Sequence, residues 1–321
     1  MNSFPISLVI PVFNEGASIT ELIDSIRAQH FQPAEVIFVD GGSTDDTVTL
    51  TKQLIAADLR FQIVEAGRAM PGKGRNIGAA HAKNEWIAFT DAGIKLDNYW
   101  LEELGKTANA NPEAAIIYGN YSPFINTFFE KCATIAYVSP EIQGQIRGEF
   151  IASSMFRKEV WEKAGGFPDW RAAEDLIFME KAGQLGYKVA FAPDAMVYWK
   201  LRENISSTYK RFDLYSKYNV WAGRQAYWHY GVAKQYAIVA VFLLLGVFHH
   251  WLWFLAIPLW LMARVTKRIL LHRNAFGVKT LFNPALFLLV MLLTIVIDIA
   301  TFSGWIKALL NLSSFKQVSS Q

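Results

Sequence analysis

The sequence predicts an α/β fold followed by a C-terminal transmembrane helical region. Over residues 1–200, short apolar runs alternate with amphipathic segments, which is the pattern of βαβ units. Residues 235–263 contain no Asp, Glu, Lys or Arg, and residues 280–306 contain one such residue, Asp298. Both runs exceed the ~20 residues that a membrane-spanning helix needs. We therefore expect a folded first part and a hydrophobic second part.

Apolar runs predict four strands in the first part, and turn or capping residues separate them. Ser18–Glu21 has the pattern of a capping box, so a helix is expected to begin there. Asp40–Gly42 turns the chain after the second strand, and Ser43 is placed to cap the next helix. The predicted strands are residues 6–12, 35–39, 61–64 and 86–89. The predicted helices run over about residues 18–30, from Ser43 onward, and over residues 76–82.

The elements after residue 150 are less regular. Apolar runs predict strands over 151–156 and 188–192, the second ended by Pro193. Glycines that stop helices predict the ends of the two helices between these strands. These helices are expected over 158–164 and 173–185.

Composition limits the classes of function. The 321 residues are 52% hydrophobic and 18% charged, which is apolar for a soluble enzyme of this length. The net charge of +3 is too small to indicate a nucleic-acid partner. The single cysteine, Cys132, is compatible with a reducing compartment. The first residues have no basic stretch before an apolar run, so we expect no signal peptide.

Polar residues follow the ends of the predicted parallel strands. Asn14 and Glu15 follow the first strand, Asp40 follows the second, and Asp91 follows the fourth. One Asp at a strand end is ordinary turn chemistry. Ligands of parallel α/β sheets bind beyond the carboxyl ends of the strands, so these residues together predict a polar ligand site.

A glycine-rich basic segment lies before the helix predicted at 76–82. Gly67–Lys73 fits the first positions of a phosphate-binding P-loop, but Gly74 stands where the magnesium-binding hydroxyl is required. A weaker hypothesis survives, because a loop with Arg68, Lys73 and Arg75 before a helix N-terminus suits a diphosphate. A solvated basic loop is the alternative.

These segments, taken in order, resemble glycosyltransferase family 2. The resemblance covers roughly residues 5–200 and implies the Rossmann-like mixed sheet of the glycosyltransferase A fold. Glu174–Asp175 also fits the helix dipole as an ordinary acidic first turn, and only the resemblance gives it a function. The matching stretches are Pro11–Glu15, Val39–Thr47, Arg75–Gly78, Thr90–Gly93, Gly165–Phe167 and Glu174–Asp175.

The resemblance implies an inverting transfer from a nucleotide sugar. Asp175 would be the catalytic base, and Glu174 would help to place the acceptor. Asp40 would contact the base of the nucleotide, and Glu15 the nucleoside. The expected substrate-binding residues are Pro11, Asn14, Glu15, Asp40, Lys73, Arg75, Asp91 and Gly93.

The sequence departs from the family at two positions that bear on metal binding. Gly93 replaces the second acid of the Asp-x-Asp site, and Trp199 stands where a His is common. We therefore expect Asp91 to hold Mg²⁺ or Mn²⁺ weakly, with Asp97 nearby. Lys73 and Arg75 would then stabilise more of the negative charge of the diphosphate. The Gln-x-x-Arg-Trp motif of processive members is missing, which favours transfer of a single sugar.

The expected organisation places the enzyme at a membrane. We predict a catalytic domain (1–205), a juxtamembrane interfacial segment (206–230), transmembrane helices (231–310) and a tail (311–321). The basic, acid-free stretch 264–280 should be cytoplasmic. A hairpin that turns at His249–His250 would satisfy this, and one long tilted helix is the alternative. If residues 280–306 also span, the chain crosses the membrane three times and ends outside. Whether it crosses two or three times remains open.

The sequence thus predicts a hexosyltransferase-like enzyme in the cell (inner or plasma) membrane, multi-pass, with a cytoplasmic catalytic domain. It would move one sugar from a nucleotide sugar to a lipid-linked or glycan acceptor near the membrane, in cell-surface glycan synthesis. Two alternatives stay open. One is a non-catalytic membrane protein that kept the fold, motivated by Gly93 and Trp199. The other is a nucleotidyltransferase, which would also bind a nucleotide at this sheet edge.

Overall fold

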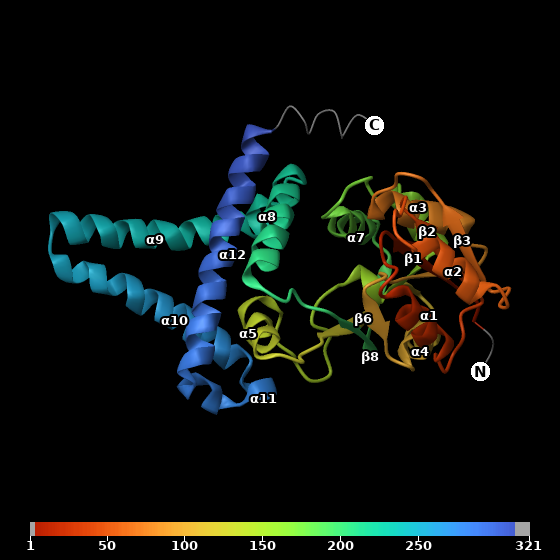
Figure 1. The fold of residues 1–321 in the computed structure, drawn as a ribbon, viewed down its shortest axis with the longest axis horizontal. Helices are drawn as coiled ribbons and strands as arrows, with labels where there is room; N and C mark the ends of the chain where they lie inside the picture. The colour runs from red at the N-terminus through yellow and green to blue at the C-terminus, as the bar shows by residue number, and fades with distance from the viewer. Residues whose placement is uncertain (1–3, 312–321) are drawn as a thin grey trace. The chain divides into compact units, whose positions relative to one another are not determined.

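The computed structural model describes residues 4–311, which form two compact units (Figure 1). The sheet unit contains residues 4–124 and 142–200, and the helical unit contains residues 125–141 and 201–311. Residues 125–141 therefore group with the C-terminal helices and not with the strands that precede them in sequence. Most of the predicted tail, residues 312–321, lies outside the described residues.

A mixed sheet of eight strands forms the centre of the sheet unit. Its order is β3-β2-β1-β4-β7-β6-β8-β5. The first four of these strands are parallel, β7 runs antiparallel to β4 and β6, and β8 is parallel to β6. This arrangement confirms the predicted α/β fold with a mixed sheet. The strands are β1 (Ile6–Val12), β2 (Glu35–Asp40), β3 (Phe61–Glu65), β4 (Trp86–Phe89), β5 (Ile94–Leu96), β6 (Ala114–Pro123), β7 (Ser154–Arg157) and β8 (Lys188–Trp199).

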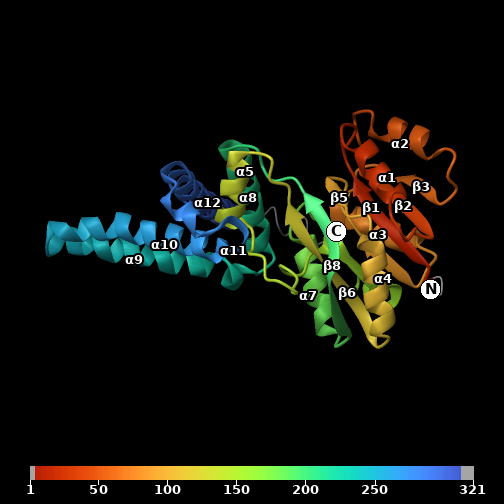
Figure 2. The same ribbon diagram turned by 90° about the horizontal axis from the view of Figure 1, so that it is seen from below.

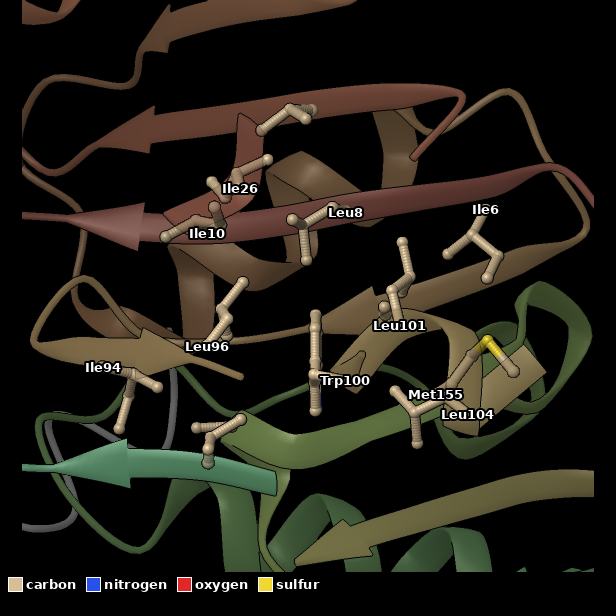
Figure 3. Close-up of a cluster of buried hydrophobic side chains, with 14 of the residues drawn as sticks. Ile6, Leu8, Ile10, Ile26, Ile94, Leu96, Trp100, Leu101, Leu104 and Met155 are labelled. Atoms are coloured by element: carbon tan, nitrogen blue, oxygen red, sulfur yellow. The ribbon is translucent and has the colours of Figure 1, made fainter. Parts of the chain in front are cut away.

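Helices cover both faces of this sheet (Figure 2). They are α1 (Ile19–Arg27), α2 (Thr47–Ile55), α3 (Pro71–His81), α4 (Trp100–Ala110), α6 (Lys158–Ala164) and α7 (Glu174–Gln184). Successive side chains of a strand point to opposite faces, so β1 buries Leu8 and Ile10 on one face and Val9 on the other. Figure 3 shows the first of these cores, where Trp100 of α4 lies among the aliphatic side chains of β1 and β5.

Two predicted strands have different boundaries in the structure. The strand expected over 151–156 is shorter, because a 3-10 turn (Ile151–Ser153) precedes β7. The strand expected to end at Pro193 continues to Trp199. Its pairing with β6 shifts register between Phe191 and Met196, so Pro193 lies in a bulge where no ladder hydrogen bond is required of it.

Helix α3 begins five residues earlier than predicted, at Pro71. Proline is favoured at the first position of a helix, because its missing N–H would have no partner there. The glycines of α3 let the helix approach β1 closely. A Cβ atom at Gly78 would overlap the side chain of Val9, and one at Gly74 would lie 3.1 Å from Cβ of Pro11. Gly74 and Gly78 therefore serve close helix–sheet packing.

The helical unit is built from six α-helices within the described residues. Helices α9 and α10 run side by side as a hairpin, and α12 runs across the base of this hairpin beside α8 (Figures 1 and 2). The helix breaks after Phe248, so residues 235–263 do not form one continuous helix. By length and composition alone, α9 and α12 could each cross a membrane. The helices are α5 (Phe128–Tyr137), α8 (Ile205–Trp221), α9 (His229–Phe248), α10 (Ala256–Leu271), α11 (Arg273–Phe276) and α12 (Pro284–Leu310).

Candidate active site

The loop after β1 is held against the loop after β2. The backbone N–H of Asn14 donates to Oγ of Ser43 over 2.9 Å, and the N–H of Thr44 donates to Oδ1 of Asn14 over 2.8 Å. Asn14 has a φ of 54°, in the left-handed region that Asn tolerates better than most residues. These contacts bring the predicted residues at the ends of two strands to one edge of the sheet.

Glu15 and Pro11 also have defined surroundings. The N–H of Glu15 donates to Oγ1 of Thr47 over 2.7 Å, and its carboxylate accepts a hydrogen bond from Ser18. Because Ser18 bonds to Glu15, it makes no capping bond to α1, and the predicted capping box is wrong. Pro11 pairs with Val39 of β2 and packs under α3, so its contribution to a ligand site is through the shape of this strand end.

Asp40 is buried at the end of β2. Its carboxylate accepts hydrogen bonds from the N–H of Gly42 over 2.9 Å and from the N–H of Ser43 over 3.1 Å. A carboxylate offers about four lone-pair sites, so these bonds leave room for a ligand. Gly41 is confined: a Cβ atom there would lie 2.6 Å from the carbonyl oxygen of Ala69. The segment after β3 therefore leaves no space for an acidic side chain at position 41.

Arg75 connects two acidic side chains that the sequence analysis treated separately. Its guanidinium donates to Oδ1 of Asp91 over 2.5 Å and to Oε1 of Glu174 over 2.8 Å. The side chain is buried, and its charge lies 5.5 Å from the ring centre of Phe167. Burial opposes the charged form, but the nearby carboxylates raise the pKa of Arg75 above its ordinary value. Both terminal nitrogens of the guanidinium are thus bound by carboxylates of the protein.

Glu174 and Asp175 form the first turn of α7. Glu174 is only 5% exposed, and its Oε2 has no hydrogen-bond partner among the described residues. Burial, reinforced by the charge of Asp175 and opposed by Arg75, raises the pKa of Glu174 to about 7. Burial also raises the pKa of Asp175, again against the attraction of Arg75. Two adjacent carboxyls with raised pKa values are the arrangement expected of acid–base chemistry.

The backbone before these acids is strained. Ala173, directly before Glu174, has a φ of 63°, which costs a non-glycine residue about 1–3 kcal/mol. Such strain persists where the surroundings hold it, and here it sets the direction in which α7 begins.

Asn76 is a residue whose role the sequence analysis missed. Its side chain donates to the carbonyl of Phe167 over 2.7 Å and accepts from the N–H of Phe167 over 2.8 Å. The indole N–H of Trp161 donates to the same side-chain oxygen over 3.0 Å. Arg75-Asn76 therefore binds both Glu174 and the Gly-Gly-Phe turn. Both motifs were visible in the sequence, but their contact was not.

The metal ligands expected near Asp91 are sparse. Gly93 has open space where a Cβ atom would stand, and β5 pairs Ile94 with Trp199 of β8, so Trp199 lies beside this loop. Asp97 accepts from the N–H of Tyr99 over 3.0 Å. Within residues 4–311, no group of three His, Cys, Asp or Glu side chains could hold a metal ion. One oxygen of Asp91 is already bound by Arg75, so the residues present fit a tightly held ion poorly.

The two basic residues ahead of Arg75 are more accessible. Lys73 is exposed in the first turn of α3, and Arg68 is exposed in the loop before this helix. The positive end of the helix dipole lies in the same turn as Lys73. The structure thus brings Arg75, Asp91, Glu174 and Asp175 together, while Lys73 remains at the surface.

Comparison with known proteins shows which family this chain resembles. Residues 7–165 match the family model Glycosyl transferase family 2. The O-antigen chain rhamnosyltransferase RfbN of Salmonella typhimurium is 28% identical over 207 residues, which cover 60% of this chain and 65% of the relative. The glycosyltransferase GlyG of Streptococcus pneumoniae is 24% identical over 228 residues, or 65% of this chain and 74% of the relative. The chain thus spans slightly less than two thirds of the rhamnosyltransferase.

A solved structure extends the comparison to the fold. The mannosyltransferase PcManGT from Pyrobaculum calidifontis, solved with GDP-Man and Mn²⁺, superposes with a TM-score of 0.61. The match covers 90% of this chain and 86% of that protein, at 18% sequence identity. At this identity, the likeness supports the glycosyltransferase A fold and no finer conclusion.

Proposed function

The chain belongs to glycosyl transferase family 2, and from this membership we propose that it moves one sugar from a nucleotide sugar to an acceptor at a membrane, in the synthesis of a cell-surface glycan. The observation that carries this proposal is the buried cluster in which Arg75 binds Asp91 and Glu174 beside Asp175. The named relatives, among them an O-antigen chain rhamnosyltransferase, support the glycan class.

Asp175 is the proposed catalytic base. An acceptor hydroxyl is a weak nucleophile at neutral pH, so a carboxylate that removes its proton speeds the attack, typically by about 10²–10⁴-fold. The raised pKa of Asp175 suits this task, because a base is most effective when its pKa lies nearer the working pH. Attack on the anomeric carbon from the side opposite the leaving diphosphate inverts the configuration of the sugar.

Glu174 is proposed to position the acceptor. Its Oε1 is held by Arg75, while its Oε2 is buried and has no partner among the described residues. A buried oxygen of this kind gains much from a hydrogen bond with a ligand hydroxyl, because it is otherwise left unsatisfied. The fixed orientation of Glu174 would direct this hydroxyl toward Asp175.

The donor would lie at the ends of β1 and β2. Asn14, Glu15 and Asp40 line this edge, and Pro11 shapes it. As the nucleoside diphosphate leaves, negative charge develops on its oxygens, and fixed positive groups stabilise it. We assign this task to Lys73 and the N-terminus of α3, because the guanidinium of Arg75 is engaged by protein carboxylates.

We propose that a divalent ion assists the reaction and is bound only weakly. When bound, Mg²⁺ or Mn²⁺ would supply charge neutralisation at the diphosphate, with Asp91 as its protein ligand. The absence of a side chain at Gly93 and the single free oxygen of Asp91 support weak binding.

We further propose that the helical unit anchors the enzyme in the cell membrane, with the sheet unit in the cytoplasm where nucleotide sugars are made. Helix α9 is long and apolar enough to cross a bilayer, and its large aliphatic side chains are exposed. The basic stretch between α10 and α12 supports a cytoplasmic flank.

A donor screen tests the proposal. The full chain in lipid nanodiscs is incubated with a panel of nucleotide sugars, and released nucleoside diphosphate and pyrophosphate are quantified separately. We expect nucleoside diphosphate from one donor. Release of pyrophosphate would identify a nucleotidyltransferase instead, and binding of nucleotide sugars without any turnover would favour a non-catalytic protein.

A further inference from the structure

The outer part of the α9–α10 hairpin exposes large apolar side chains on every side. Such a surface is unstable in water and suits the hydrocarbon of a bilayer. The 20 residues of α9 span about 30 Å, which matches the thickness of the hydrocarbon core. The exposed residues include Val241, Leu244, Val247, Phe248, Trp251 and Leu259.

Helix α12 meets this hairpin only near its base. The hydroxyl of Tyr236, in the second turn of α9, donates to Asp298 of α12 over 3.0 Å. Arg264 of α10 donates to the same carboxylate over 2.7 Å, and the ring of His229 lies 5.1 Å from that of Trp305. Beyond these contacts, α9 and α10 extend away from α12, whose axis runs across theirs (Figures 1 and 2). Helices arranged in this way cannot all stand along the membrane normal.

The two sides of α12 differ in character. One side packs on α8, where the hydroxyl of Ser216 donates to the carbonyl of Thr301 over 2.6 Å and Lys307 pairs with Asp213 at 2.7 Å. A Cβ atom at Gly304 would overlap the backbone of α8. The other side exposes apolar side chains at helical spacing, namely Leu288, Leu292, Ile299, Ile306 and Leu310.

The packing of α12 on α8 opposes a spanning position. Helix α8 carries Lys210, Arg211 and Lys217, so a spanning α12 would draw these charges toward the hydrocarbon. Helix α12 is itself apolar along most of its length, so its in-plane position is argued from two other features: it runs across the hairpin, and one of its sides is covered by the basic helix α8. Helices that lie in the plane of the membrane sit at the boundary between headgroups and acyl chains, about 5–10 Å deep.

The distribution of charged residues indicates the side of the membrane on which α12 lies. Residues 214–321 carry ten Lys and Arg residues and one acid, Asp298, whereas the whole chain has a net charge of only +3. The bases in the C-terminal part of α10 and in the segment that joins it to α12 would face the anionic headgroups of the cytoplasmic leaflet. They are Lys267, Arg268, Arg273 and Lys279.

We infer that α12 lies in the plane of the cytoplasmic membrane interface, with its apolar stripe on the acyl chains of phospholipids, and that only the α9–α10 hairpin crosses. Residues 4–311 then cross twice, and α12 ends on the side of the membrane that holds the sheet unit. This inference rests on the membrane anchoring proposed above. It differs from the external C-terminus expected if residues 280–306 span. The ion pair of Arg264 and Asp298 ties the hairpin to the in-plane helix.

Topology reporters test this arrangement. A reporter that is active on one side of the membrane is fused to the chain after His250, Arg273 or Gln321. We expect the first fusion to be external and the other two cytoplasmic. An external reporter after Gln321 overturns the in-plane helix while leaving the anchoring intact. If the protein is instead extracted from membranes at high pH with all three reporters cytoplasmic, the anchoring itself fails, and this inference with it.

A matched pair of variants gives a second, independent test. Ile238→Lys and Ile299→Lys each place a charge at an exposed apolar position near the middle of a helix, in α9 and α12 respectively. In-plane placement predicts that Ile299→Lys inserts normally, because its ammonium can reach the headgroups, whereas Ile238→Lys greatly lowers the membrane-inserted fraction. Equal losses of insertion would contradict the inference, because they would place both helices in the hydrocarbon core.

Discussion

Arg75 and Glu174 are 99 positions apart in the chain, and a 2.8 Å hydrogen bond joins their side chains. The same guanidinium binds Asp91 at 2.5 Å. Asp91 is proposed to act on the donor and Glu174 on the acceptor, so one buried cation sets the spacing between the two proposed substrate positions. We therefore propose Arg75 as a positioning residue, with Lys73 and the N-terminus of α3 stabilising the diphosphate.

Loss of this cation should destabilise the sheet unit. Arg75→Met leaves a buried carboxylate of Glu174 without its partner, so we expect the free energy of unfolding to fall by about 3–5 kcal/mol. Arg60→Met is the control, because Arg60 pairs with Asp58 near the surface and should cost about 1 kcal/mol or less. Denaturant unfolding of the full chain in detergent measures both. If the two variants lose the same free energy of unfolding, Arg75 does not stabilise the fold by bridging the two carboxylates.

The pH dependence of transfer should report the acidic pair. Because burial raises the pKa of Asp175, we expect the rate to fall at a pH above the ordinary titration range of an aspartic acid, as this base becomes protonated. Glu174→Gln removes a neighbouring negative charge, so the acid limb of the profile should move to lower pH. An unmoved acid limb in this variant would show that Glu174 does not influence the titrating base.

The same pKa predicts how stability changes with pH. A carboxyl whose pKa rises on folding, here from 4.5 to about 7, favours the folded state at low pH. This contribution is complete below the unfolded pKa and is lost as the pH rises through about 7. The unfolding free energy of the wild type relative to Glu174→Gln should therefore decline between about pH 4.5 and 7, as chemical denaturation at several pH values can show.

Gly93→Asp should tighten metal binding. The added side chain meets open space, so it can supply the second carboxylate of an Asp-x-Asp site without displacing a neighbour. We expect loose, millimolar-scale dependence on Mn²⁺ in the wild type, and a half-saturating concentration about tenfold lower in the variant. Gly183→Asp is the control, because it adds the same group at another open position. Tight dependence in the wild type would mean that another residue supplies the missing ligand.

Asp40→Ala should weaken nucleotide binding and alter the preference among bases. The substitution also removes the acceptor for the N–H groups of Gly42 and Ser43, so Asp40→Asn, which keeps one acceptor oxygen for this turn, is the matched variant. Calorimetric titration with the nucleoside diphosphate measures both. If affinity is unchanged in Asp40→Ala, Asp40 is only a turn residue.

The sequence predicted the parallel strands because each is a short apolar run that ends in turn residues. It missed β6, although Ala114–Tyr118 is such a run, and it ended β8 at Pro193 because a proline normally cannot continue a ladder. The bulge opposite β6 removes that conflict, and this depends on a partner strand that is distant in sequence.

Within the site, strand-end positions could be predicted and side-chain partners could not. Position along a parallel sheet follows from the order of elements, so Asn14, Asp40 and Asp91 were identifiable. The binding of Arg75 to Glu174 and of Asn76 to Phe167 depends on how α3 packs against α7 and its preceding turn. Charge alone suggested a diphosphate for Arg75. Hydropathy likewise measures how apolar a helix is and carries no information on the angle at which the helix lies to the membrane.

Asp175 is proposed to remove the proton of the acceptor hydroxyl, and the variant Asp175→Asn separates this role from donor binding. The variant keeps the size of the side chain and its hydrogen bond from the N–H of Leu176, but it cannot accept a proton. Donor affinity is measured by calorimetry and sugar transfer by release of nucleoside diphosphate, both on the full chain in lipid. We predict a loss of transfer of about 10²-fold or more with donor affinity nearly unchanged. Turnover close to that of the wild type would exclude Asp175 as the catalytic base.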